Sequence, residues 1–130
     1  MNQQTVDRLQ ERILAAWNSQ DVSRVLDCYA ADVQYLDPDT GGPVNGKDAL
    51  AHHLEKLFGN IVAVTTARSA FPAVGVEGVT VLWTATVRRA AGNAEVQVDG
   101  VDFVRFDGEL IDRHEVYFDR VALMPLLEAA

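Results

Sequence analysis

The feature that most constrains the fold is a change in hydrophobic period near residue 60. From about residue 4 to 18, apolar residues recur at three- and four-residue spacing, which is the pattern of an amphipathic helix. After residue 60 the period becomes two, and Val, Thr and aromatic residues dominate, as in strands. Helices followed by a run of strands predict an α+β protein, with the helices packed on one face of a bent, mostly antiparallel sheet.

Three helices are expected before the change of period. The first carries an apolar stripe of Val6, Leu9, Ile13, Ala16 and Trp17 and ends at Asn18-Ser19-Gln20. Asp21 can cap a second helix, in which Val22, Val25, Leu26 and Tyr29 share a face. A short strand from Val33 to Leu36 follows, and a third helix is predicted from about Lys47 to Phe58, with Gly59-Asn60 ending it.

Four long strands are expected after residue 60. They are "IVAVTTARSAF", "GVTVLWTATVRR", "AEVQVDGVDFVRF" and "ELIDRHEVYF", separated by turn-like segments. The dipeptide Asp107-Gly108 between the last two is a strong hairpin signal. Leu123 to Leu127 can close the chain as a short helix, in which Pro125 is restricted to the first turn.

The length, net charge and cysteine content of the chain limit the classes of function that it can have. The 130 residues suit one domain spanning 1–130. Net charge is −8 and the eleven Lys and Arg are scattered, which argues against nucleic acid and membrane surfaces as partners. The single cysteine, Cys28, excludes an intramolecular disulfide, and we expect it to be a buried residue of the second helix. The polar N-terminus predicts no signal peptide, hence a cytoplasmic protein.

Asp102 interrupts an otherwise apolar strand face. In "AEVQVDGVDFVRF" alternate residues share a face, so Asp102 falls in phase with Val98, Val104 and Phe106. A carboxylate there is costly unless it is paired, hydrogen-bonded or neutralised. Two structural alternatives to a functional site are a β-bulge at Gly100 that turns Asp102 outward, and an ion pair with Arg105 or Arg113.

Asp37 ends the first predicted strand, in "QYLDPDTGG". An aspartate before proline favours a turn. A carboxylate at a cavity mouth would instead have its pKa raised by desolvation, which suits it to abstract a proton next to a carbonyl. The two interpretations are compatible.

The histidines do not form a metal site. His52 and His53 are adjacent on a helix and point about 100° apart, so they cannot chelate one ion. His53 shares a stripe with Leu50 and Leu57, and either a half-buried structural role or a site role fits it. His114 is in phase with Val116 and Phe118 and can face a cavity. Metal-ligand spacing and Gly-rich phosphate loops are absent from the sequence, so we expect neither a metal nor a cofactor.

The chain resembles the nuclear transport factor 2-like superfamily, the cone-shaped α+β fold of ketosteroid isomerase, scytalone dehydratase and SnoaL-like polyketide cyclases. "AAWNSQDVSRVLDCYAADVQYLDP" is similar to the superfamily's N-terminal segment, and "VDFVRFDGELIDRHEVYFD" to its closing hairpin. The resemblance covers essentially the whole chain. It implies a cone of helices wrapped by a strongly curved sheet that is open at one end, where core residues also line a pocket.

The resemblance also implies roles for individual residues. Ketosteroid isomerases use two carboxylates with divergent pKa values, and their general base corresponds to Asp37 of this chain. Their protonated, oxyanion-binding aspartate falls on Asp102. Their oxyanion tyrosine falls on Ile13, which has no hydroxyl, so Tyr35 or His114 would have to supply that hydrogen bond. The acid–base set of limonene epoxide hydrolases is missing, and of the histidines of scytalone dehydratases only His53 and His114 are candidates.

Two function classes follow. The first is a cofactor-free isomerase, cyclase or dehydratase acting on a small apolar carbonyl compound, and the second is a non-catalytic ligand-binding or association domain. The catalytic candidates are Asp37 and Asp102. The candidate pocket residues are Ile13, Trp17, Tyr35, His53, Trp83, His114, Val116 and Phe118, although aromatic residues at these periods are core by default. Val101 and Phe103, on the opposite face of the Asp102 strand, predict a homodimer through the sheet.

Overall fold

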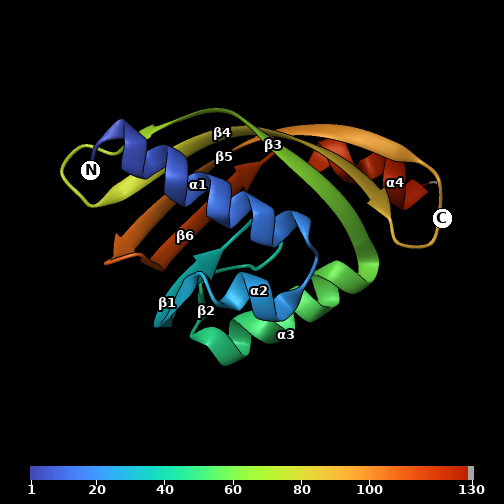
Figure 1. Cartoon of the computed structure of the whole chain (residues 1–130). Coiled ribbons are helices and arrows are strands. Elements are labelled where there is room, and N and C mark those ends of the chain that lie inside the picture. Colours follow the sequence, from blue (N-terminus) through green and yellow to red (C-terminus); the bar gives the residue numbers. More distant parts are fainter. Residues whose placement is uncertain (129–130) are drawn as a thin grey trace.

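The computed structural model describes residues 1–128, with helices in the first half of the chain and a long curved sheet in the second (Figure 1). The elements are α1 (Gln3–Asn18), α2 (Val22–Leu26), β1 (Tyr29–Leu36), β2 (Val44–Asn45), α3 (Lys47–Asn60), β3 (Ile61–Pro72), β4 (Gly78–Arg89), β5 (Glu95–Asp107), β6 (Leu110–Phe118), the 3₁₀ helix η1 (Arg120–Leu123) and α4 (Met124–Glu128). The change of period near residue 60 coincides with the boundary between α3 and β3.

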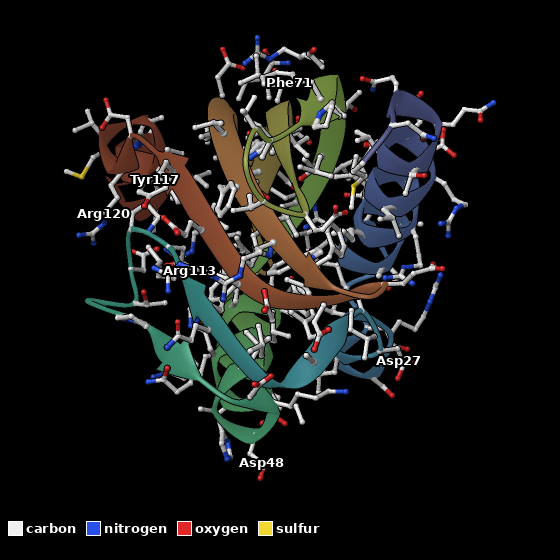
Figure 2. All side chains as sticks on the ribbon, turned by 90° about the vertical axis from the view of Figure 1, so that its left-hand side faces the viewer. Asp27, Asp48, Phe71, Arg113, Tyr117 and Arg120 are labelled. Carbon is white, nitrogen blue, oxygen red and sulfur yellow. The ribbon has the colours of Figure 1, made fainter. Side chains whose placement is uncertain are left out.

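The sheet is open and runs in the order β2-β1-β6-β5-β4-β3. β1 pairs in parallel with β6, and every other neighbouring pair is antiparallel. In Figure 1, α1 crosses the long strands and α2 and α3 lie at the end of the sheet near β1 and β2. Phe71 at the end of β3 lies at the opposite end of the molecule from Asp48 in α3 (Figure 2). This is the predicted α+β arrangement, with helices on a mostly antiparallel sheet.

The first two helices both begin at a side-chain cap, and the one at Asp21 was expected. Asn2 accepts a hydrogen bond from the Thr5 amide at the start of α1, and Asp21 accepts one from the Arg24 amide at the start of α2. The predicted extent of the second helix is wrong. α2 ends at Leu26, and Tyr29 begins β1, because its backbone pairs with Ile111 of β6. Cys28 is buried, as expected, but lies in the turn after α2.

Other boundaries differ more modestly from the prediction. β1 starts four residues earlier than Val33, and the two-residue strand β2 was not predicted. α3 does not stop at Phe58 but includes Gly59 and Asn60, and β3 begins at the next residue, Ile61. The predicted closing helix is a 3₁₀ turn followed by α4. The hairpin at Asp107-Gly108 is confirmed: Asp107 pairs with Leu110, and Gly108 adopts a φ of 63° that favours glycine.

Asn18, the last residue of α1, and Gln20, just after it, hold the edge strand β3 in place. The Asn18 side chain donates to the Thr65 carbonyl at 2.9 Å and accepts from the Thr65 amide at 2.8 Å. Gln20 bonds the Ile61 carbonyl and the Ala63 amide in the same way. These side chains use the outer backbone edge of β3, which has no strand neighbour among residues 1–128. They therefore fix how far α1 and β3 can separate.

Within the described part of the chain, no helix is long and apolar enough to span a membrane.

Candidate functional site

A cavity of about 160 Å³ lies between α1, α3 and the inner face of the sheet. Nine of the ten residues singled out from the sequence line it: Ile13, Trp17, Tyr35, Asp37, Trp83, Asp102, His114, Val116 and Phe118. The tenth, His53, is not among the lining residues and sits behind Asp37, to which it is hydrogen-bonded. Both candidate carboxylates therefore meet one mostly apolar cavity.

Asp102 faces the cavity because β5 runs without interruption past Gly100. The pairing of β4 with β5 is continuous from Gly78 opposite Arg105 to Arg88 opposite Glu95, so there is no bulge at Gly100. The irregularity in β5 occurs later, between Arg105 and Phe106. The second structural alternative also fails, since the side chain of Arg105 bonds Asp112 and that of Arg113 bonds Glu115 and Gln34.

Gly100 has a packing role in the site. It lies directly opposite Trp83, and the indole ring covers it so closely that a Cβ at residue 100 would meet Trp83 Cζ2 at 2.1 Å. A glycine within a strand often marks such a close approach. Because the ring lies over Gly100, Trp83 Nε1 reaches Asp102 Oδ1 two residues along β5, at 2.8 Å.

The Asp102 network is a chain of buried hydrogen bonds. Trp17 Nε1, which can only donate, gives its proton to the Tyr29 hydroxyl at 3.0 Å. The hydroxyl lies 2.7 Å from His114 Nδ1, and His114 Nε2 lies 2.8 Å from Asp102 Oδ2. The arrangement that satisfies every atom has Tyr29 donating to Nδ1 and a neutral His114 donating from Nε2. Asp102 then accepts at both oxygens, which is the arrangement of a carboxylate anion.

The Asp37 network combines the turn and the inward-facing carboxylate. Oδ1 accepts from the Asp39 amide at 2.8 Å, so Asp37 does form the expected turn. Oδ2 accepts from the Tyr35 hydroxyl at 2.8 Å and from His53 Nε2 at 2.9 Å. Only 6% of the Asp37 side chain is exposed, against 19% for Asp102. Asp37 is therefore a buried carboxylate with three donors around it.

The expected direction of the Asp37 pKa was wrong. Burial does raise this pKa, as predicted from desolvation. The hydrogen bonds from His53, Tyr35 and the Asp39 amide, with the charge interaction with His53, together outweigh it and hold the pKa below the usual value of 3.8. Hydrogen bonds to the charged form favour that form, so Asp37 is ionised at neutral pH and is a weaker base than expected.

Tyr35 and His114, the two side chains expected to replace the missing oxyanion tyrosine, are already hydrogen-bonded to other groups. Ile13 does line the cavity, without a hydroxyl. The Tyr35 hydroxyl donates to Asp37, and burial raises the pKa of Tyr35 well above 10.0. Both ring nitrogens of His114 have partners. Neither side chain has a free proton for an oxyanion in this arrangement.

Aromatic rings form much of the remaining wall. Trp17 packs against Tyr35 with ring centroids 6.0 Å apart and against Phe58 edge-on at 5.8 Å. Trp83 of β4 and Phe118 of β6 are 6.2 Å apart. In the part of the chain that the structure describes, no cluster of three His, Cys, Asp or Glu side chains could hold a metal ion.

Sequence reasoning missed Tyr29, which links Trp17 to His114. Its apolar spacing with Val22 and Val25 suggested a helix, and the signal that could have corrected this was the aromatic residue that opens "YAADVQYL", whose later residues alternate. Gln10 was also missed. It lines the cavity, and its buried Oε1 has no hydrogen-bond partner among residues 1–128.

Solved structures with the same fold are numerous, although no curated protein matches the chain. A candidate isomerase from Bacillus subtilis superposes with a TM-score of 0.86 at 10% identity, over 98% of this chain and 95% of that one. A candidate polyketide cyclase from Xanthomonas campestris gives 0.82 at 17% identity, over 98% and 99%. A protein with a ketosteroid isomerase-like fold from Catenulispora acidiphila, solved in complex with trimethylamine, gives 0.80 at 18% identity, over 91% and 90%.

These likenesses agree in fold with the expected nuclear transport factor 2-like architecture. The family model of the SnoaL-like domain matches residues 10–114, which include the second half of α1, the strands β4 and β5, and both carboxylates. The chain belongs to the SnoaL-like domain family.

Proposed function

We propose that this chain is a cofactor-independent enzyme of the isomerase or cyclase type, which moves a proton on a small apolar carbonyl compound. The observation that carries the proposal is the presence of two carboxylates, each hydrogen-bonded to a histidine, at one apolar cavity. A positioned carboxylate beside an apolar ligand is suited to abstract a proton next to a carbonyl. Family membership and the isomerase and cyclase names of similar structures support the same reaction class.

Asp102 is the better candidate for the base. It has two donors where Asp37 has three, and more of its side chain is exposed. Its free lone pairs can therefore take a proton without displacing a partner. His114 holds the carboxylate in place, but both of its ring nitrogens are occupied, so we assign it a positioning role. The base role that the family resemblance gives to Asp37, and the acid role it gives to Asp102, stay predictions.

A non-catalytic ligand-binding domain is the second candidate. One observation favours it: Tyr35, His114 and Trp83 all donate to carboxylates, so none has a proton for a developing oxyanion. Stabilisation of that charge is usually a large part of catalysis.

Hydrogen–deuterium exchange separates the two candidates without knowledge of the product. Small cyclic ketones are incubated with the protein in D₂O, and deuterium entry next to the carbonyl is followed by NMR. The enzyme proposal predicts exchange faster than in buffer, lost in Asp102→Asn and kept in Asp99→Asn, which removes the same charge from the opposite face of β5. Binding of ketones without exchange would support the ligand-binding domain.

We also propose that the chain works in the cytoplasm as a homodimer through the outer face of its sheet. Directly paired residues share a face, so Leu82, Val101 and Tyr117 form one row across three strands, and Thr80, Phe103 and Glu115 form the next. Tyr117 is 48% exposed, and Phe71, beside Thr80, is 42% exposed. Sedimentation at micromolar concentration should give a dimer, and Tyr117→Glu should give a monomer. A wild-type monomer would contradict the proposal.

A further inference from the structure

The charged groups around the cavity all have the same sign. Asp37, Asp39 and Asp102 line it, and the described lining residues include no Lys or Arg. Asp39 pairs with Arg120 at 2.9 Å and both side chains are exposed to solvent, so the charge of Asp39 is balanced and screened. Asp102 is bonded to Trp83 and, in the arrangement described above, to a neutral His114, which hold its negative charge without cancelling it, whereas Asp37 is paired with His53.

Among the uncharged polar groups of the cavity, Gln10 adds one further acceptor. Trp83, Tyr35 and His114 point their protons at carboxylates. Gln10 contributes a buried Oε1 that has no partner in the described chain. A ligand group that enters this cavity thus meets lone pairs. A carboxylate or phosphate would be repelled, and a hydrogen-bond donor or a cation would be stabilised.

The aromatic rings favour a cation specifically. Trp17 packs against both Tyr35 and Phe58, and Trp83 packs against Phe118. The faces of Trp, Tyr and Phe attract a positive charge, most strongly when it is desolvated. A cavity of about 160 Å³ is close to the apolar cavity of about 150 Å³ that holds benzene, so a single-ring molecule suits it.

We infer that the cavity selects small apolar cations, such as amines protonated at neutral pH, and pairs their positive charge with Asp102. The inference rests on the proposed binding of small molecules in this cavity and adds the charge of the ligand.

Three single-ring probes test the inference: benzylammonium, benzyl alcohol and benzoate. Trp17 and Trp83 are the only tryptophans in the chain and both line the cavity, so intrinsic fluorescence reports on its occupancy. Calorimetry gives the affinities. Benzylammonium should bind about tenfold or more tightly than benzyl alcohol, because cation–π and charge-assisted contacts add to the same ring burial. Benzoate should bind most weakly.

The matched variants are Asp102→Asn and Asp99→Asn. Asp99 lies on the outer face of β5 with its carboxylate bonded to Thr84, so its variant removes one charge without touching the cavity. The preference for benzylammonium should fall to about that of benzyl alcohol in Asp102→Asn and persist in Asp99→Asn. If Asp102→Asn does not fold, the ratio of the affinities of the wild-type protein for benzylammonium and benzyl alcohol tests the inference by itself.

Equal or tighter binding of benzyl alcohol would overturn the inference and leave the proposed function standing. A preference that survives unchanged in folded Asp102→Asn would overturn the pairing with Asp102. Failure of all three probes to bind would overturn both the inference and the proposed binding of small molecules.

Discussion

The two carboxylate–histidine pairs at the cavity look alike in composition and differ in how many hydrogen bonds they receive. Asp37 lies in the turn after β1, accepts three hydrogen bonds and has little exposed surface. Asp102 lies in the middle of β5, accepts two and is three times as exposed. The comparison teaches that a saturated carboxylate stabilises the structure around it, whereas a partly satisfied one is available to a ligand.

The largest difference between the pairs should be in catalysis. Asp102→Asn should lower kcat/KM for any substrate found by about 10²- to 10⁴-fold, because it removes the group that takes the proton. Steady-state kinetics on purified, folded variants measure this. A loss of the same size in Asp99→Asn would show that the effect is one of overall charge, and a fully active Asp102→Asn would remove Asp102 from the mechanism.

Asp37→Asn should act mainly on stability. The single oxygen of an amide can face either the Asp39 amide or the Tyr35 and His53 donors, but not all three, because an NH₂ group replaces the other carboxylate oxygen. Leaving one of these buried donors without its charged partner should lower the free energy of unfolding by about 1–3 kcal/mol. Urea denaturation measures the change. An Asp37→Asn protein of wild-type stability and abolished turnover would instead restore Asp37 as the base.

Gly100→Ala tests the packing that aims Trp83 at Asp102. A methyl group at residue 100 would overlap the indole, so the ring must move and its hydrogen bond to Asp102 must lengthen. We expect a cost of about 1–2 kcal/mol in urea denaturation, typical of overpacking, and a shift of the tryptophan emission. The matched control is Gly59→Ala in α3, where a Cβ meets nothing within 4 Å. It should be neutral or slightly stabilising, and equal costs at both positions would contradict the packing argument.

The smallest effect concerns pH. The pKa of Asp37 is lowered in the folded protein, so its contribution to stability is complete above the unfolded value near 3.8 and is lost as the pH falls through the lower folded value. The stability gap between wild type and Asp37→Asn should therefore be constant from pH 7 to about pH 5 and shrink below about pH 4. Urea midpoints across this range measure it. A gap that widens on acidification would mean that the Asp37 pKa is raised.

Much of the fold was predictable because it depends on local periodicity. The change from helical to alternating spacing located α1, α3 and the four long strands, and an uninterrupted alternation placed Asp102 on the inner face. Boundaries set by tertiary pairing were not predictable. Tyr29 fits the helical stripe that precedes it, yet pairing with Ile111 draws it into β1, and β2 exists only through its two pairs with β1.

The identity of the cavity residues was easier to predict than their hydrogen bonds. Desolvation of Asp37 follows from its position, but the opposing effect depends on His53, sixteen residues away, and on the orientation of the Tyr35 hydroxyl. His53 was expected in the cavity wall and lies behind Asp37 instead. The chain of contacts from Trp17 through Tyr29 to His114 joins three distant segments, which no local pattern encodes.

A crystal structure of the protein with benzylammonium bound tests most directly whether Asp102, and not Asp37, meets the ligand. We expect the ammonium nitrogen within hydrogen-bonding distance of the Asp102 carboxylate, the ring between Trp17 and Trp83, and Asp37 still bonded to Tyr35, His53 and the Asp39 amide. An ammonium bound to Asp37 with Tyr35 or His53 displaced, and Asp102 untouched, would contradict this expectation.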